Sequence, residues 1–199
     1  MGEPRFDRLC VFCGSRHGAR PAYAEAAAEL GRTLAARGIE LVYGGGNVGL
    51  MGVVADACLA GGGTVTGVIP QALMDWEVGH SGLSRLEIVG SMHERKARMA
   101  ELSDGFIALP GGLGTFEELF EMLTWAQLGF HAKPIALLDV GGYYEPLRQL
   151  MSAAVDEGFM KPQNAERLLV APGVDTVLRA MGDYVAPRTD ARIENTDQL

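Results

Sequence analysis

The chain has 199 residues, 48% of them hydrophobic, which suffices for one globular domain that buries about 70% of its unfolded surface. Its formal net charge of -8 argues against a nucleic-acid partner or an anionic membrane surface, because both require a basic face. The sequence predicts no transmembrane span, since it lacks an apolar run of about 18 residues, and no signal peptide. With three cysteines, an odd number, the expected compartment is the cytoplasm.

Strands and helices are predicted to alternate along the whole chain. The predicted strands are residues 8–13, 40–43, 64–69, 86–89, 105–109 and 134–138. The predicted helices are residues 21–37, 49–60, 91–102, 115–128, 144–157 and 175–181. The strands are continuous apolar runs, as expected where helices cover both faces of a sheet. This pattern predicts one Rossmann-like α/β domain over 1–185, a doubly wound parallel sheet with helices on both faces, and a flexible tail over 186–199.

Three of the predicted strands end in loops rich in glycine or small residues. These loops begin at Gly14 after the first strand, at Gly44 after the second, and at Pro110 after the fifth. With a strand order of 3-2-1-4-5-6, the first and fourth strands would flank the switch point and the fifth would lie beside the fourth. Ligands of such sheets bind at the carboxyl ends of the strands, so the loops would converge on one crevice. Ser15, Gly45 and Gly46 are candidate ligand contacts in the first two loops.

Residues 110–118 read Pro-Gly-Gly-Leu-Gly-Thr-Phe-Glu-Glu, between a buried strand and a long helix. Such a turn leaves backbone N–H groups unpaired beside the positive end of the helix dipole, which is typical of a phosphate site. Two carboxylates one turn further, Glu117 and Glu118, indicate bond-breaking chemistry on a phosphorylated substrate. An alternative is a capping box, with Thr115 at the N-cap and Glu118 three residues later, stabilising the helix by about 1 kcal/mol.

Arg95 and Lys96 are predicted near the start of the helix over 91–102, one turn from the carboxyl edge of the sheet. A guanidinium and an ammonium at this place suit an anionic substrate. The alternative is a solvated basic face on an acidic protein.

Other motifs point to structure rather than chemistry. Gly44-x-Gly46-x-x-Gly49 matches the dinucleotide fingerprint only formally, because it follows the second strand and no acidic residue ends the next one. Cys10 and Cys13 have the spacing of a redox or zinc motif but lie in a predicted strand, where their side chains would point to opposite faces. We expect core cysteines and no metal site.

The helix over 116–130 carries apolar residues on more than one stripe, whereas a surface helix of a monomer shows one polar face. We therefore expect a homodimer that uses the 115–130 region.

Four segments together resemble a known family, over roughly residues 9 to 181. They are Met-His-Glu-Arg-Lys at 92–96, the 110–118 loop, Thr-Trp-Ala-Gln-Leu-Gly at 124–129, and Lys133-Pro134. The resemblance is to the LOG ("Lonely Guy") family of cytokinin riboside 5'-monophosphate phosphoribohydrolases, formerly labelled lysine decarboxylases. It implies hydrolysis of the N-glycosidic bond of N6-substituted adenosine monophosphates, and of AMP itself, to free base and ribose 5-phosphate, without a cofactor.

The resemblance also assigns residues. The catalytic arginine and glutamate of the family fall on Arg95 and Glu118. Its substrate contacts fall on Glu77, Arg95, Lys96, Gly111, Gly112, Leu113, Gly114, Thr115, Phe116, Glu117 and Thr124. Two departures concern the base pocket: Asp75-Trp76 precedes Glu77 where plant-like members carry Pro-Arg, and Leu113 replaces a frequent tyrosine.

These residues suggest a mechanism. Glu118 is expected near the anomeric carbon, where it orients water or stabilises an oxocarbenium-like state, while Arg95 keeps it ionised. His93 is one candidate acid for the departing purine.

Two alternatives stay open: a non-catalytic carrier of a phosphorylated cofactor such as molybdenum cofactor, and a less selective AMP nucleosidase. Lysine decarboxylation finds no support, because such enzymes need a lysine Schiff base with a pyridoxal cofactor.

Overall fold

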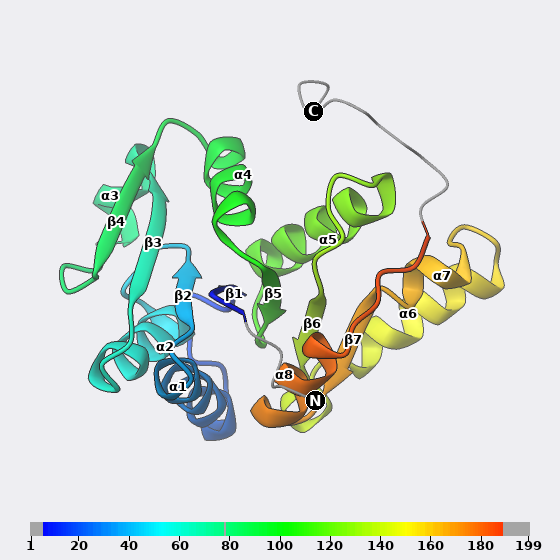
Figure 1. Ribbon diagram of the computed structural model, residues 1–199, viewed down its shortest axis with the longest axis horizontal. Helices are drawn as coiled ribbons and strands as arrows, with labels where there is room; N and C mark the ends of the chain where they lie inside the picture. The colour runs from blue at the N-terminus through cyan, green and yellow to red at the C-terminus, as the bar shows by residue number, and fades with distance from the viewer. Residues whose placement is uncertain (1–5, 78, 189–199) are drawn as a thin grey trace.

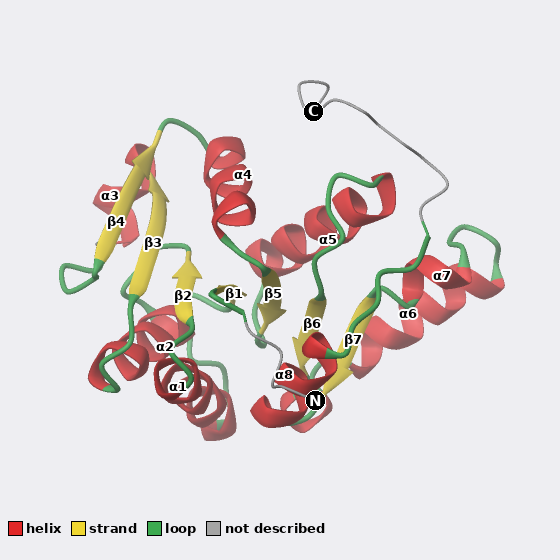
Figure 2. Cartoon of the chain, viewed as in Figure 1, coloured by secondary structure: helices red, strands yellow, loops and turns green. Residues whose placement is uncertain are grey.

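The computed structural model describes residues 6–77 and 79–188, which form a seven-stranded parallel sheet with helices on both faces (Figures 1 and 2). The strands are β1 (Arg8–Phe12), β2 (Glu40–Tyr43), β3 (Val65–Pro70), β4 (Arg85–Val89), β5 (Gly105–Ala108), β6 (Ile135–Leu138) and β7 (Leu168–Ala171). The helices are α1 (Pro21–Ala36), α2 (Gly49–Ala60), α3 (Gln71–Glu77), α4 (Met92–Leu102), α5 (Leu113–Leu128), α6 (Glu145–Asp156), α7 (Pro162–Ala165), α8 (Val174–Gly182) and the 3-10 turn η1 (Val140–Gly142). The predicted doubly wound α/β fold is confirmed.

The sheet separates two hydrophobic cores, and successive residues of β1 enter them alternately. Leu9 and Val11 pack in the core beneath α1, α2 and α8, while Cys10 and Phe12 pack in the core beneath α4 and α5. Figure 1 shows these two groups of helices on opposite sides of the strands. Burial on both faces explains why the strands read as unbroken apolar runs.

The strand order is β4-β3-β2-β1-β5-β6-β7, so the predicted order was wrong in one respect. The fourth strand pairs with β3 at the edge of the sheet, and the fifth strand, not the fourth, pairs with β1. The switch point therefore lies between β1 and β5. This places the loop after β1 directly beside the glycine-rich loop after β5.

The sequence prediction found most elements within two residues of their bounds but missed β7, α3 and α7. These three are short, and β7 is only partly buried, so their apolar patterns are weak. The helix predicted from residue 115 begins two residues earlier, at Leu113.

Within the described part of the chain, no helix has the length and apolar character needed to cross a bilayer.

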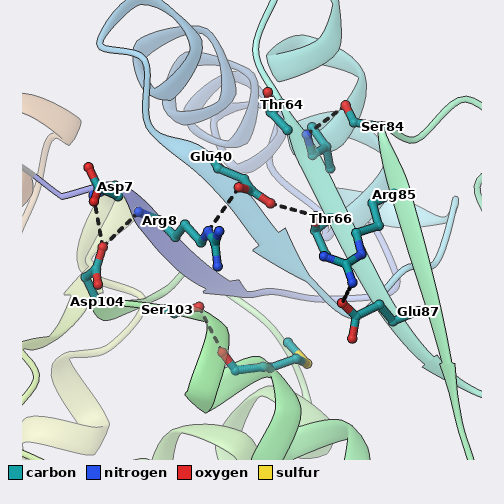
Figure 3. Close-up of polar contacts among 12 residues, drawn as sticks. Asp7, Arg8, Glu40, Thr64, Thr66, Ser84, Arg85, Glu87, Ser103 and Asp104 are labelled. Carbon is teal, nitrogen blue, oxygen red and sulfur yellow. Dashed lines mark hydrogen bonds and ion pairs between the residues drawn. The ribbon is translucent and has the colours of Figure 1, made fainter.

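Polar side chains hold the amino-terminal edge of the sheet together (Figure 3). Glu40 accepts hydrogen bonds from Arg8 Nε (3.1 Å) and from Thr66 Oγ1 (2.6 Å), which links β1, β2 and β3. The Asp104 carboxylate accepts from the backbone N–H groups of Asp7 and Arg8, both at 2.9 Å. The charged groups at this edge thus have partners within the fold, and the candidate site residues gather at the opposite, carboxyl edge.

The segment predicted as a flexible tail starts with residues that contact the domain. The buried side chain of Arg167 donates from Nη2 to the carbonyl oxygens of Pro187 (3.0 Å) and Arg188 (3.4 Å). The rest of the predicted tail, 189–199, lies outside the described residues.

Candidate active site

Three loops meet at the carboxyl edge of the sheet through close contacts at their glycine residues. The N–H of Gly14 donates to the carbonyl of Pro110 (3.1 Å), and the carbonyl of Gly14 accepts from the N–H of Leu50 (3.0 Å). A Cβ on Gly14 would lie 3.3 Å from the Cα of Gly111, and one on Gly111 would lie 2.1 Å from Thr115 Oγ1. The expected convergence of the loops is thus confirmed, with backbone packed on backbone.

A cavity of about 560 Å³ opens beside this junction. Its lining includes four predicted contacts, Ser15, Gly111, Gly112 and Leu113. It also includes Arg16, His17 and Tyr143, which sequence reasoning missed. Arg16 and His17 could have been noticed as basic residues next to a predicted loop contact, whereas Tyr143 is 32 residues away from Gly111 and gives no local signal.

Among the described residues, the backbone N–H groups in the first turn of α5 have no acceptor, as the sequence predicts. Gly112 is the N-cap residue, and the first N–H of the helix with a backbone acceptor is that of Phe116, which donates to the Gly112 carbonyl (3.0 Å). The alternative capping box is wrong: Thr115 lies inside the helix, buried against Gly111, and no side chain caps it. The cap therefore does not explain Glu118.

A charged cluster of five side chains lies between α4 and α5: Arg95, Lys96, Glu117, Glu118 and Glu121. Arg95 and Glu118 pair with each other in this cluster. Arg95 is 6% exposed and Glu118 is 8% exposed, and their Nη2 and Oε1 atoms are 3.6 Å apart. The guanidinium approaches Gly44, directly after β2, with its Nη2 atom, which would lie 1.9 Å from a Cβ at this position. Among the described residues, Arg95 Nε is buried without a hydrogen-bond partner. A buried cation with a spare donor is costly unless a ligand uses it, which favours a functional role.

Lys96 is more fully paired than Arg95. Its ammonium forms ion pairs with Glu117 and with Glu121, the second at 3.0 Å. Burial lowers the pKa of Lys96, but the hydrogen bonds to the two carboxylates outweigh burial and leave the pKa above its ordinary value. Lys96 is therefore a charged tie between α4 and α5, and the solvated basic face considered for Arg95 and Lys96 is wrong because both are buried.

The two cysteines of β1 and its following loop lie in opposite cores, as predicted: Cys10 on the α4–α5 side and Cys13 on the α1–α2 side. Burial, together with the nearby Glu118 carboxylate, raises the pKa of both thiols well above the ordinary value. They remain neutral thiols, which is the expected state of core cysteines.

The remaining predicted contacts are scattered. Gly45 has a left-handed φ of 78° and lies against Ile69 and Leu86, so packing accounts for it, and Gly46 pairs with Gly79 in an isolated bridge. A ligand contact at either glycine stays a prediction. Thr124 is exposed on α5, where its hydroxyl donates to the carbonyl of Phe120 (2.7 Å).

Three other predicted contact residues lie in α5 and at the end of α3. Gly114 and Phe116 lie in the first turns of α5 beside the donors described above. Glu77 ends α3, and its side chain lies outside the described part of the structure. A contact of any of the three with substrate stays a prediction.

A second, larger cavity of about 780 Å³ lies between α4 and α5. Its wall includes the apolar side chains Ala97, Trp125 and Phe130, together with His93 and Glu121. His93 is exposed there, on the first turn of α4.

Comparison with known proteins identifies close relatives. Residues 51–181 match a family described as "Possible lysine decarboxylase". The chain is 53% identical over 191 residues to "Probable cytokinin riboside 5'-monophosphate phosphoribohydrolase LOGL1" of Oryza sativa subsp. japonica, covering 93% of this chain and 86% of that protein. It is 51% identical over 182 residues to cytokinin riboside 5'-monophosphate phosphoribohydrolase LOG7 of Arabidopsis thaliana, covering 92% and 84%.

A solved structure shares the fold at lower identity. The molybdenum cofactor carrier protein of Chlamydomonas reinhardtii superposes with a TM-score of 0.67 at 23% identity, covering 88% of this chain and 96% of that one. Identity this low establishes the common architecture alone. The plant proteins, half of whose aligned residues are identical, settle the family: the chain belongs to the LOG family of cytokinin riboside 5'-monophosphate phosphoribohydrolases.

Proposed function

We propose that this protein hydrolyses the N-glycosidic bond of N6-substituted adenosine 5'-monophosphates, and of AMP, releasing the free base and ribose 5-phosphate. The observation that carries the proposal is the placement of two unlike features on one helix. The unpaired N–H groups lie at the start of α5, and Glu118 lies on its second turn, about 8 Å along the axis from Leu113. That separation is on the scale of one ribose phosphate.

Glu118 is proposed as the carboxylate at the anomeric carbon. Cleavage of a glycosidic bond passes through an oxocarbenium-like state, which a nearby carboxylate stabilises while it orients the attacking water. Arg95 Nη2 lies 3.6 Å from Glu118 Oε1, and this ion pair is proposed to fix the position of the carboxylate. The unpaired Nε of Arg95 supplies a donor for the substrate.

The backbone N–H groups from Gly111 to Thr115 are proposed to clamp the 5'-phosphate. Such a clamp uses binding energy remote from the reacting bond to position the sugar. A nucleoside without phosphate should therefore be a poor substrate. We expect kcat/KM for N6-isopentenyladenosine to be at least about 100-fold below that for its monophosphate, because several charge-assisted hydrogen bonds are lost.

Chromatographic detection of free base measures this ratio directly. Equal turnover of nucleoside and nucleotide would rule out the clamp. The same assay decides between the candidate functions: a carrier would bind the nucleotide without releasing base, and a less selective nucleosidase would cleave AMP as fast as isopentenyl-AMP.

We further propose a homodimer that forms through the 115–130 region. Phe120 on α5 is 37% exposed and Met92 on α4 is 41% exposed, beside the partly apolar groove between these two helices. A second copy of the chain would cover these side chains. Light scattering is expected to give the mass of two chains, and Phe120→Glu the mass of one. Leu150→Glu, at an exposed leucine of α6, serves as the control and should remain dimeric.

A further inference from the structure

Four consecutive carbonyl groups in the loop after β5 all have hydrogen-bond donors. Pro110 accepts from the N–H of Gly14 (3.1 Å), and Gly112 accepts from the N–H of Phe116 (3.0 Å). The other two donors are adjacent tyrosines. Tyr144 Oη donates to the carbonyl of Leu109 (2.7 Å), and Tyr143 Oη donates to the carbonyl of Gly111 (2.5 Å).

Fixing these carbonyls also fixes the N–H groups between them. In a trans peptide the C=O of one residue and the N–H of the next lie in one plane and point in opposite directions. The bond from Tyr143 to the Gly111 carbonyl therefore turns the N–H of Gly112 away from Tyr143. Within residues 6–77 and 79–188, neither Gly111 nor Gly112 donates its N–H to another group of the protein.

The two tyrosines are held by a turn that leaves them little freedom. Gly141 and Gly142 both have left-handed backbones, with φ of 63° and 74°, and they precede Tyr143 directly. Asp139 Oδ1 accepts from the N–H of Tyr144 (2.8 Å), and the Tyr143 ring makes edge contacts with the rings of Tyr144 and Tyr23. The turn after β6 thus fixes the two tyrosines that donate hydrogen bonds to the loop after β5.

The two tyrosines differ in where they lie. Tyr144 is 1% exposed, and its hydroxyl completes the core beneath the loop. Tyr143 is partly buried and lines the 560 Å³ cavity together with Gly111 and Gly112. Removing its hydroxyl would release a carbonyl at the wall of the cavity, where water can reach it. The fold should tolerate that change better than the loss of the buried Tyr144 hydroxyl.

We propose that Tyr143 is a positioning residue for recognition of the 5'-phosphate: its hydroxyl holds the Gly111–Gly112 peptide in the orientation that presents the Gly112 N–H to the phosphate. The inference rests on the phosphate clamp of the proposed function. It adds a side chain outside the motifs that identify the family members, acting through backbone and not touching the substrate.

The test is calorimetric binding of ribose 5-phosphate, which does not depend on turnover. In Tyr143→Phe the peptide is free to rotate, and the Kd for ribose 5-phosphate should rise about tenfold, the equivalent of roughly 1.4 kcal/mol. The Kd for N6-isopentenyladenine, the product without phosphate, should not change. Tyr184→Phe removes a tyrosine hydroxyl near Arg167 that does not belong to the lining of the cavity, and it should change neither constant.

An unchanged Kd for ribose 5-phosphate in Tyr143→Phe would overturn the inference. An equal loss of affinity for the base would also overturn it, because it would indicate a general structural role.

If Tyr143→Phe fails to fold, Gly142→Ala provides the test. Its Cβ would meet nothing within 4 Å, but the left-handed backbone would be strained, so affinity for ribose 5-phosphate should fall in the same direction by less. A wild-type protein that binds ribose 5-phosphate but releases no base would refute the proposed hydrolysis and leave the role of Tyr143 standing.

Discussion

The loop after β5 and the charged cluster between α4 and α5 differ in how their polar groups are paired. In the loop, each carbonyl from Leu109 to Gly112 has a donor within the fold, whereas the N–H groups of Gly111 and Gly112 have no acceptor among the described residues. In the cluster, charged side chains are buried with incomplete pairing, and both Arg95 Nε and Glu121 Oε2 lack partners among the described residues. We therefore propose that the loop binds an anion and that the cluster provides polar groups for the reacting substrate.

This contrast predicts that changes in the cluster affect turnover while changes in the loop affect binding. The largest effect is expected for Glu118→Gln, which keeps the shape of the side chain and removes its charge. We expect kcat for isopentenyl-AMP to fall about 10²- to 10⁴-fold, with ribose 5-phosphate affinity within about twofold of wild type. Steady-state kinetics and calorimetry provide the two numbers.

Glu121→Gln, one turn further along α5, is the matched control and should alter kcat only a few-fold, because Lys96 retains Glu117. If the two variants lower kcat to the same extent, the assignment of Glu118, rather than the cluster as a whole, to the reacting bond is wrong.

Gly44→Ala tests the cluster without touching a charge. A Cβ at this position would lie 1.9 Å from Arg95 Nη2, so the guanidinium must shift, and its contact with Glu118 is disturbed. A displacement of this size should lower kcat about 10- to 100-fold. Gly173→Ala is the control, because nothing lies within 4 Å of its Cβ. Wild-type kcat in Gly44→Ala would mean that the position of Arg95 does not matter for the reaction.

The smallest expected effect concerns a neutral side chain beside the cluster. Burial lowers the pKa of His131 to about 4, despite a hydrogen bond with the carbonyl of Met122. The unfolded chain gains a proton at His131 near pH 6.5, whereas the folded protein does so only near pH 4. The free energy of unfolding should therefore decrease as the pH falls through this window, with a contribution on the order of 1 to 2 kcal/mol at pH 5.

Urea unfolding at pH 8 and pH 5 measures this difference. His131→Gln keeps a donor for the Met122 carbonyl and removes the titration, so its stability should fall less between the two pH values. An identical pH dependence in wild type and variant would show that His131 does not remain neutral.

Most of the fold could be predicted from the sequence, and so could the charged pair of the site, but not the side chains that hold the phosphate loop. Continuous apolar runs between helices predict the elements, and Arg95 and Glu118 were recognisable because each follows a strand at the carboxyl edge. The strand order was not recognisable, since chain order alone does not decide whether the fourth strand pairs with β3 or with β1. The start of α5 was misplaced because Thr115 and Glu118 imitate a capping box.

The support of the phosphate loop could not be predicted from local sequence. Tyr143 and Tyr144 reach the loop from 32 and 35 residues away, and only the folded turn through Gly141 and Gly142 brings them there. Arg16 and His17 line the cavity for a similar reason, because the Ser15–Arg16 peptide packs against Gly49 while Gly14 packs against the loop after β5.

The central claim is that one helix binds the phosphate at its first turn and acts on the sugar–base bond at its second. A crystal structure of the Glu118→Gln variant with isopentenyl-AMP tests this most directly. The account predicts phosphate oxygens at hydrogen-bond distance from the N–H groups of residues 111–115, with the anomeric carbon next to the substituted side chain. A nucleotide bound with its phosphate away from the start of α5, or with its ribose remote from residue 118, would contradict it.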